Sequence, residues 1–224
     1  MDMEYGKAAA FPRQDPDWVK KLGIAGLLSI VPVFGWVLVA GYETEVTRRV
    51  INDDPRPLPE WSDFGGLLIK GFSALVVRLV YFLPLLLFVV CSAAPLLIGN
   101  AVVGPNRSNQ GLITTVWVLS GCFGCVALLY AVLAGMLAPI AVARYAAVGN
   151  LMAAFQLSEV WRLFRVKPGV YVATAVMSAL MYGLLSFLGV LACVIGAAFG
   201  WAYATLIAGH LQGQAYRHVT APPA

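Results

Sequence analysis

The chain has 224 residues, of which 60% are hydrophobic and only 12% are charged, and its formal net charge is +4. Soluble domains carry roughly 25% charged residues, so the composition excludes an ordinary water-soluble globular protein. The positive balance does not indicate a nucleic-acid partner, because the basic residues flank apolar runs, where the positive-inside rule of membrane proteins places them.

Four stretches of 20 or more residues contain no charged residue. They are Leu22–Tyr42, Leu79–Ile98, Gly111–Ala143 and Pro168–Tyr216. About 20 apolar helical residues cross a bilayer core, so each stretch can cross once and the last can cross twice. This predicts an all-α integral membrane helical bundle with an N-terminal membrane segment and four further transmembrane helices. One membrane domain, residues 17–217, is expected between mobile tails at residues 1–16 and 218–224.

The first apolar stretch, residues 22–42, has two interpretations. Pro32 removes a helical hydrogen bond and Gly35 permits conformations that other residues resist, so the stretch can turn back as a membrane-dipping hairpin. It can also cross as one helix kinked at Pro32. The hairpin is favoured because it places nearly all basic residues on one side, with the loops 43–71 and 144–168 and the C-terminus in the cytoplasm.

A stiff, acidic insert, DDPRPLPEWSDF, follows at residues 53–64. If Glu60–Phe72 is helical, its apolar residues share one face. They are Trp61, Phe64, Leu68 and Phe72. We therefore predict an interfacial amphipathic helix with Trp61 and Phe64 anchored among the lipid headgroups. The acidic residues also allow a metal loop, but the prolines leave little freedom to fold around an ion, so no metal site is predicted.

Two features of the next stretches bear on chemistry. Arg78 stands just inside the second apolar stretch, where an ionisable residue is often functional, although its long side chain can also reach the headgroups. Cys122 and Cys125 have the CxxC spacing of redox proteins. No polar neighbour lowers a thiol pKa there, so close packing is the simpler role.

The segment after the third charge-free stretch repeats the arrangement predicted for Glu60–Phe72. Its apolar stripe comprises Leu157, Val160, Trp161 and Phe164, with charged residues opposite. This predicts a second interfacial amphipathic helix anchored by Trp161 and Phe164.

The last stretch predicts two helices joined by a short turn near residues 191–194. Small residues recur every four positions on the second helix: Gly196, Gly200, Ala204 and Ala208. Such a ribbon lets another helix approach closely, either from this chain or from a second protomer. Further along, His210 can line a polar mouth, or it marks an ordinary exit into water. Arg78 and His210 are the candidate polar site residues.

Three stretches resemble the domain of unknown function 4013 family, a prokaryotic family of membrane proteins. They are GYETEVTRRVINDDPRPLPEWSDF (41–64), APIAVARYAAVGNLMAAFQLSEVWRLF (138–164) and AGHLQGQAYR (208–217). The LPEW and GQAYR elements are the most specific. The resemblance implies a multi-helix protein of a bacterial or archaeal cytoplasmic membrane and brings no activity. Glu43 and Glu45 depart from it, because apolar residues are expected there, and this leaves the depth of the segment open.

The sequence offers no HExxH motif, no Ser-His-Asp set and no phosphate-binding glycine loop, so no catalytic, cofactor-binding or metal-binding residue is predicted. The expected function is a non-catalytic membrane module or accessory subunit that packs against lipids, another membrane protein or a second copy of the chain. The alternative is a small permease or channel, which requires a polar-lined path between the two halves.

Overall fold

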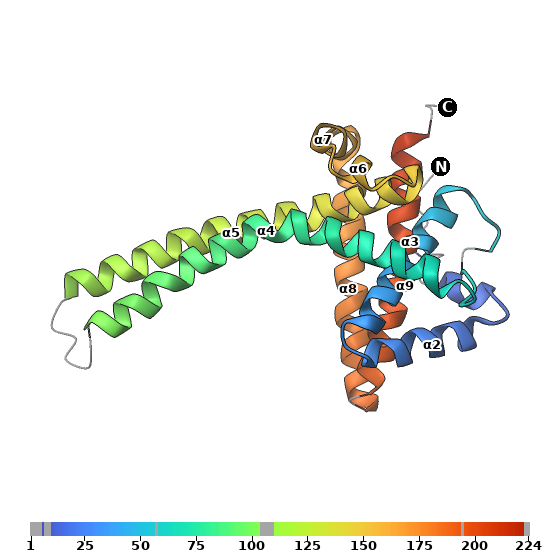
Figure 1. Ribbon diagram of the computed structural model, residues 1–224, viewed down its shortest axis with the longest axis horizontal. Helices are drawn as coiled ribbons and strands as arrows, with labels where there is room; N and C mark the ends of the chain where they lie inside the picture. The colour runs from blue at the N-terminus through green and yellow to red at the C-terminus, as the bar shows by residue number, and fades with distance from the viewer. Residues whose placement is uncertain (1–5, 7–9, 57, 104–109, 194, 222–224) are drawn as a thin grey trace. The chain divides into compact units, whose positions relative to one another are not determined.

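Every element of the computed structural model is a helix, and no strand occurs among residues 6, 10–56, 58–103, 110–193 and 195–221, which the structure describes. In chain order the elements are η1 (Phe11–Gln14), α2 (Trp18–Ile30), α3 (Phe34–Ile51), α4 (Phe64–Val103), α5 (Gln110–Val148), α6 (Leu151–Ala154), α7 (Leu157–Val166), α8 (Pro168–Ala192) and α9 (Gly196–Thr220) (Figure 1). The all-α prediction is confirmed. Of the predicted mobile tails, residues 1–5, 7–9 and 222–224 lie outside the described residues.

The chain divides into two compact units, whereas the sequence predicts one membrane domain. Unit 1 comprises Met1–Arg78 and Met136–Ala224, and unit 2 comprises Leu79–Gly135. Helices α4 and α5 each contribute to both units. Within unit 1, α9 packs against α8, α3, α2 and η1, and is therefore its central helix.

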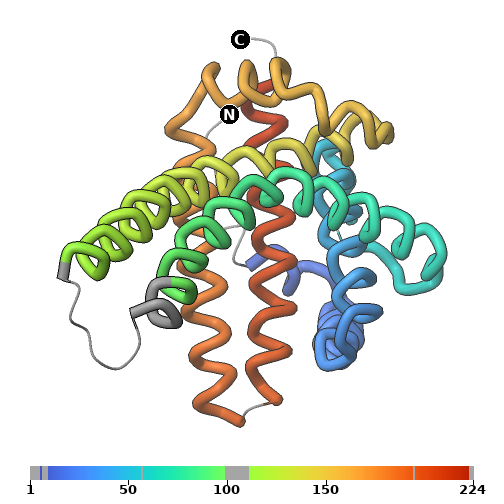
Figure 2. The backbone as a smooth tube through the Cα atoms, turned by 60° about the vertical axis from the view of Figure 1, so that its left-hand side comes forward, coloured from blue at the N-terminus to red at the C-terminus, as the bar shows by residue number. Residues whose placement is uncertain are grey.

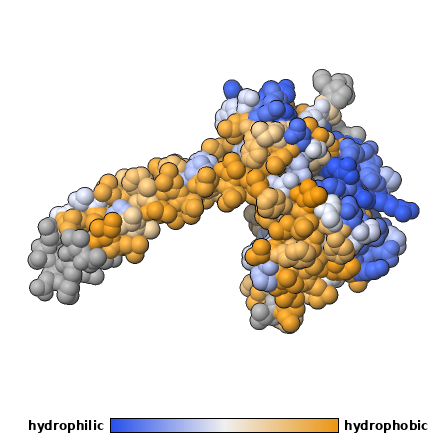
Figure 3. All heavy atoms as spheres, viewed as in Figure 1, coloured by the Kyte–Doolittle hydropathy of each residue, from blue (hydrophilic) through white to orange (hydrophobic). Residues whose placement is uncertain are grey.

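Three helical segments are long and apolar enough to cross a membrane: Phe64–Ile98, Gly111–Val148 and Pro168–Ala192. Their most apolar windows are only 17%, 33% and 0% buried, so the apolar side chains point outward. Orange hydrophobic atoms cover most of the visible surface of unit 2 (Figure 3). The last of the four predicted transmembrane helices forms as α9. It is not one of the three segments that are apolar enough to cross a membrane by composition. Because α9 is surrounded by other helices, it can carry polar residues that a lipid-facing helix excludes.

The break predicted at Pro32 occurs. A turn at Val31–Val33 separates α2 from α3, and Val33 has a positive φ of 63°. Gly35 follows immediately, and a Cβ there would lie 1.8 Å from the carbonyl oxygen of Leu28 in α2. Residues 18–51 therefore form two separate helices joined by a tight turn, which only glycine at position 35 permits.

The LPEW element folds back onto α2 and α3. The Trp61 ring stacks on Tyr42 with a centroid separation of 4.3 Å, and its Nε1 donates a hydrogen bond to the Lys21 carbonyl at 3.0 Å. The Tyr42 hydroxyl donates to the Pro59 carbonyl at 2.8 Å, and the Lys21 ammonium pairs with Glu60 at 2.7 Å. Trp61 is only 7% exposed, so it lies in the protein core and not among headgroups as predicted. The indole finds its aromatic and hydrogen-bonding partners inside the chain.

The helix predicted at Glu60–Phe72 begins later, at Phe64, and continues without interruption as α4. A turn precedes it, and the Asp63 carboxylate accepts a hydrogen bond from the Gly66 amide at 2.9 Å. Phe64 is exposed, whereas Leu67 is buried against the core. Phe64, Leu68 and Phe72 of the predicted stripe thus lie in the first turns of α4, and Trp61 lies in the turn before it.

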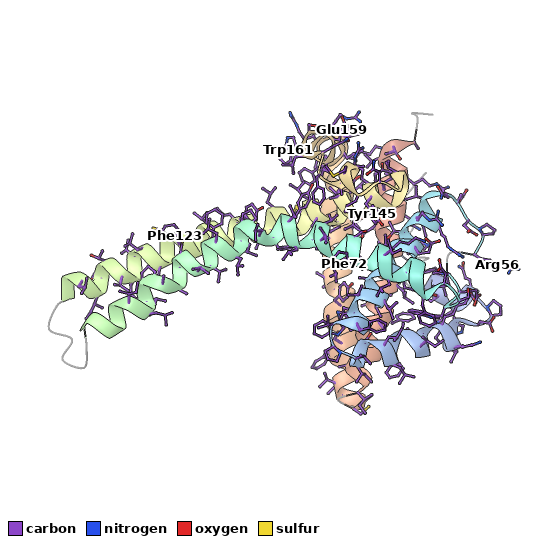
Figure 4. The ribbon with its side chains drawn as sticks, viewed as in Figure 1. Arg56, Phe72, Phe123, Tyr145, Glu159 and Trp161 are labelled. Atoms are coloured by element: carbon purple, nitrogen blue, oxygen red, sulfur yellow. The ribbon has the colours of Figure 1, made fainter. Side chains whose placement is uncertain are left out.

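The second predicted connecting helix forms as α7. It buries Val160 and Leu163 and leaves Trp161 exposed, with the Trp161 and Phe164 rings 5.5 Å apart. Figure 4 shows Trp161 and Glu159 projecting from α7. The interfacial position of Trp161 stays a prediction.

Helices α8 and α9 run side by side in opposite directions, joined by a short connection after Ala192 (Figure 2). The small-residue ribbon faces α8 at its start: a Cβ on Gly196 or Gly200 would lie 2.5 or 2.1 Å from a carbonyl oxygen of α8. Ala204 and Ala208 are also buried. At Gly196 and Gly200 the partner of the ribbon is thus a helix of the same chain.

Candidate functional site

A partly buried ion pair lies between α3 and α4 in unit 1. Arg78 Nη2 is 2.6 Å from Glu43 Oε2, and the side chains are 31% and 3% exposed, respectively. Gln212 of α9 donates from Nε2 to the other carboxylate oxygen, Glu43 Oε1, at 3.3 Å. The carboxylate therefore receives one charged and one neutral hydrogen bond, which offset part of its desolvation cost.

The backbone around Glu43 is also tightly held. The Thr47 hydroxyl lies 2.9 Å from the Glu43 carbonyl oxygen and 3.0 Å from that of Gly209 on α9. A Cβ on Gly209 would come within 2.9 Å of the same Glu43 carbonyl. Glycine at this position therefore lets α9 approach α3 closely enough for Gln212 to reach the carboxylate.

The two residues predicted as a polar site have different partners. Arg78 pairs with Glu43, whereas His210 stacks on Phe11 of η1 with a ring separation of 4.2 Å. Phe11 falls within the predicted N-terminal tail but is only 2% exposed. His210 thus helps fix the N-terminal segment to α9, and its Nδ1 makes no hydrogen bond within the described part of the chain.

A second acidic side chain, Glu45, lies two positions after Glu43 on α3 and gathers a cluster of basic side chains around it. Its oxygens accept from Arg48 at 2.9 Å, Arg49 at 3.1 Å and Lys70 of α4 at 2.8 Å. Burial alone would raise the pKa of Glu45, but hydrogen bonds from these three cations lower it to about 2. Glu45 is therefore ionised at neutral pH, and it joins the ends of α3 and α4.

Sequence reasoning singled out Arg78 but missed its partner. Glu43 and Glu45 were noticed as acidic residues where the family pattern expects apolar ones, and that departure was the available signal. The pairing with Arg78 spans 35 positions along the chain, so no local pattern could reveal it. Gln212 lies 169 positions from Glu43, so its contact with the carboxylate could not be predicted from a local pattern either.

Unit 2 contains an apolar groove of about 380 Å³ between α4 and α5. It is lined by Cys91, Ala94, Pro95, Ile98, Leu112, Val116 and Phe123. Figure 4 shows Phe123 on α5. The Tyr130 hydroxyl donates to the Tyr81 carbonyl at 2.8 Å and fastens the two helices. The groove carries no charged group, so it suits an apolar occupant such as an acyl chain.

Neither unit presents an arrangement for metal chemistry within the described residues, where no group of three or more His, Cys, Asp or Glu side chains could hold an ion. Cys122 and Cys125 are exposed free thiols on α5. The polar groups that unit 1 offers are hydroxyls, amides and an ion pair whose two charges balance. These groups can form hydrogen bonds.

Outward-facing apolar side chains, and three helices that are long and apolar enough to cross a membrane, are features of a helical membrane protein. A family model described as a protein of unknown function (DUF4013) matches residues 24–194, which is most of the chain. The chain belongs to this family. No curated protein and no solved structure was found that matches it.

Proposed function

We propose that the protein is a non-catalytic integral membrane module that packs against lipids or other membrane proteins. The exposed apolar face of α8 carries this proposal. Leu180, Leu184 and Leu188 are at least half exposed along a helix of 25 residues. Water would disfavour such a continuous apolar surface, whereas acyl chains or neighbouring helices cover it without cost.

We place the module in the cytoplasmic membrane of a prokaryote, with residues 43–71, 144–168 and the C-terminus in the cytoplasm. The basic residues of these segments support this orientation through the positive-inside rule. Helix α9 then crosses the bilayer inside the bundle, shielded by α8 and α3. The pair α2 and α3 enters the membrane from the cytoplasmic side and turns back at Val31–Val33, because α2 has only 13 residues and is too short to cross.

The polar side chains support a structural role for unit 1. Glu43, Glu45 and Lys21 each have partners within the chain at hydrogen-bonding distance. These contacts join α3 to α4 and the N-terminal segment to α2. In such a module the apolar exterior contacts the partners, and the charged side chains hold the helices of unit 1 together.

The test is purification in lipid nanodiscs followed by mass spectrometry of every bound species. A stoichiometric membrane-protein partner, or a second copy of the chain, is expected. Empty nanodiscs and an unrelated membrane protein of similar size, purified in parallel, control for contaminants. A protein that is monomeric and retains one small molecule, without any partner, would contradict the module.

A small permease is the second candidate, favoured by one observation. The Glu43–Arg78 pair and Gln212 form a polar network inside unit 1, where a simple structural bundle needs only apolar packing. Arg78 stands within the apolar segment Phe64–Ile98, and ionisable side chains inside membrane bundles often mark solute paths. Uptake of a solute by reconstituted vesicles would move this candidate to first place.

A further inference from the structure

Buried polar atoms that lack a hydrogen bond gather in one part of unit 1. Among the described residues, all of these side-chain atoms except Ser120 Oγ lie on α8 or α9. They belong to Tyr171, Thr174, Ser178, His210, Gln212 and Gln214. Tyr171 and Thr174 are only 6% and 5% exposed. Leaving a buried hydroxyl or amide unpaired costs free energy, so such clustering favours a polar partner between the helices.

The three residues on α8 share one face. Tyr171, Thr174 and Ser178 are separated by three and four positions, the spacing that aligns side chains along a helix. Tyr182 continues the same row four positions later, and its hydroxyl donates to Thr205 Oγ1 on α9 at 3.2 Å. The row therefore follows the α8–α9 interface. We name it the polar seam, which comprises Tyr171, Thr174, Ser178, Tyr182, Thr205 and Gln212.

The polar seam is closed at one end. Thr205 Oγ1 also donates to the Trp201 carbonyl at 2.9 Å, so the hydrogen-bonding capacity at Tyr182 is largely used within the protein. Beyond this point the helices touch through their backbones: a Cβ on Gly200 would lie 2.1 Å from the Leu185 carbonyl oxygen. No solute can pass between helices so close. At the other end, where α8 begins at Pro168 and α9 ends at Thr220, a flexible side chain and not a close backbone contact links the helices: the Lys167 ammonium donates to the His218 carbonyl at 3.3 Å.

The charge beside the polar seam is balanced. Gln212 donates to Glu43, whose carboxylate is paired with Arg78. The Gln212 Oε1 atom makes no hydrogen bond. A bound cation would face the guanidinium and a bound anion would face the carboxylate, so neither sign is favoured. Hydroxyl and amide groups match a solute that both donates and accepts hydrogen bonds without a net charge.

We propose that the polar seam is a one-ended, water-accessible site for a small uncharged solute that carries hydroxyl or amide groups. The solute enters at the Pro168 and Thr220 end and stops at the Tyr182–Thr205 hydrogen bond. The site goes beyond the module function, and it supplies the solute site that a permease would need.

Substituted cysteines test the site in the full-length protein in nanodiscs. The four native cysteines are first replaced by alanine; they are Cys91, Cys122, Cys125 and Cys193. Ser178→Cys places a thiol in the polar seam. Ser186→Cys is the matched control, the same substitution in the closed half of α8. Leu180→Cys is the lipid-facing control. The probe is 2-hydroxyethyl methanethiosulfonate, a small uncharged alcohol, and its addition is followed by intact mass.

Thiols react as thiolates, which form in water and not in lipid or dry packing, so Ser178→Cys is expected to react at least about tenfold faster than both controls. Thr174→Cys provides a second position within the polar seam and is expected to react equally fast. Rates at both positions that are no faster than at Ser186→Cys would overturn the site.

Charged versions of the reagent test the class of solute. Trimethylammonium-ethyl and sulfonatoethyl methanethiosulfonate are expected to modify Ser178→Cys at least about tenfold more slowly than the hydroxyethyl reagent, after correction for their rates with a free thiol. Equal or faster modification by either charged reagent would overturn the preference for uncharged solutes. A nanodisc-bound protein partner bears only on the module function, so failure of one proposal is distinguishable from failure of the other.

Discussion

Substitution of Gly71 by alanine is expected to lower the free energy of unfolding by at least about 2 kcal/mol, because the added methyl group has no room. A Cβ at Gly71 would lie 1.8 Å from the Val37 carbonyl oxygen, and one at Gly41 would lie 1.9 Å from that of Leu67. Both obstacles are backbone atoms of the facing helix. The strain can be relieved only by moving α3 away from α4, which would also separate Glu43 from Arg78.

Gly65→Ala is the matched control, since it makes the same change in the same helix at a position with open space around it. Alanine there is expected to be neutral or to stabilise the protein by up to about 1 kcal/mol, because it favours helix more than glycine does. Equilibrium unfolding in mixed detergent micelles measures both variants. If Gly71→Ala were as stable as Gly65→Ala, the close contact of α3 with α4 would be wrong.

Removal of Arg78 is expected to cost about 3–5 kcal/mol of stability, since it leaves the Glu43 carboxylate buried without its cation. Glu43 is only 3% exposed and cannot turn to solvent. Arg78 is 31% exposed and has a long side chain, so Glu43→Gln is expected to cost less, because the guanidinium can extend toward water or headgroups. The two substitutions should therefore be unequal in effect.

The double variant Glu43→Gln, Arg78→Met separates a true pair from two independent residues. Its loss is expected to be smaller than the sum of the single losses by at least about 1 kcal/mol, since residues in contact couple. The same unfolding measurement applies to the four proteins of this cycle. Additive losses would show that the 2.6 Å contact contributes nothing to stability.

Local patterns in the sequence predicted much of the helical framework. The turn at Val31–Val33 coincides with Pro32, which removes a helical hydrogen bond, and α7 follows from its apolar period. The charge-free length of the last stretch required two helices, and they form as α8 and α9. Each of these features depends on neighbours within a few positions, which is why they can be read directly from the chain.

Features that depend on distant residues could not be predicted in the same way. The sequence around Trp61 is typical of a headgroup anchor. The structure shows instead that Tyr42 and Lys21 contact its ring within the core. The contact of Gly41 with α4 could not be predicted from the sequence either, because glycines are common in membrane helices and do not by themselves indicate a close contact. The Glu43–Arg78 pair joins residues that lie 35 positions apart.

The central claim is that apolar helix faces meet lipid while the polar and aromatic core of unit 1 does not. Two single-tryptophan proteins test it, one that retains Trp117 and one that retains Trp61, with the remaining tryptophans replaced by phenylalanine. Trp117 lies within the apolar segment Gly111–Val148 of α5 and is 66% exposed, whereas Trp61 is 7% exposed.

Fluorescence quenching in bilayers of lipids with brominated acyl chains is the most direct measurement, because bromine quenches tryptophan only at near contact. Strong quenching of Trp117 and weak quenching of Trp61 are predicted. Equal quenching of the two residues would contradict the account. So would Trp117 fluorescence that brominated lipid does not quench.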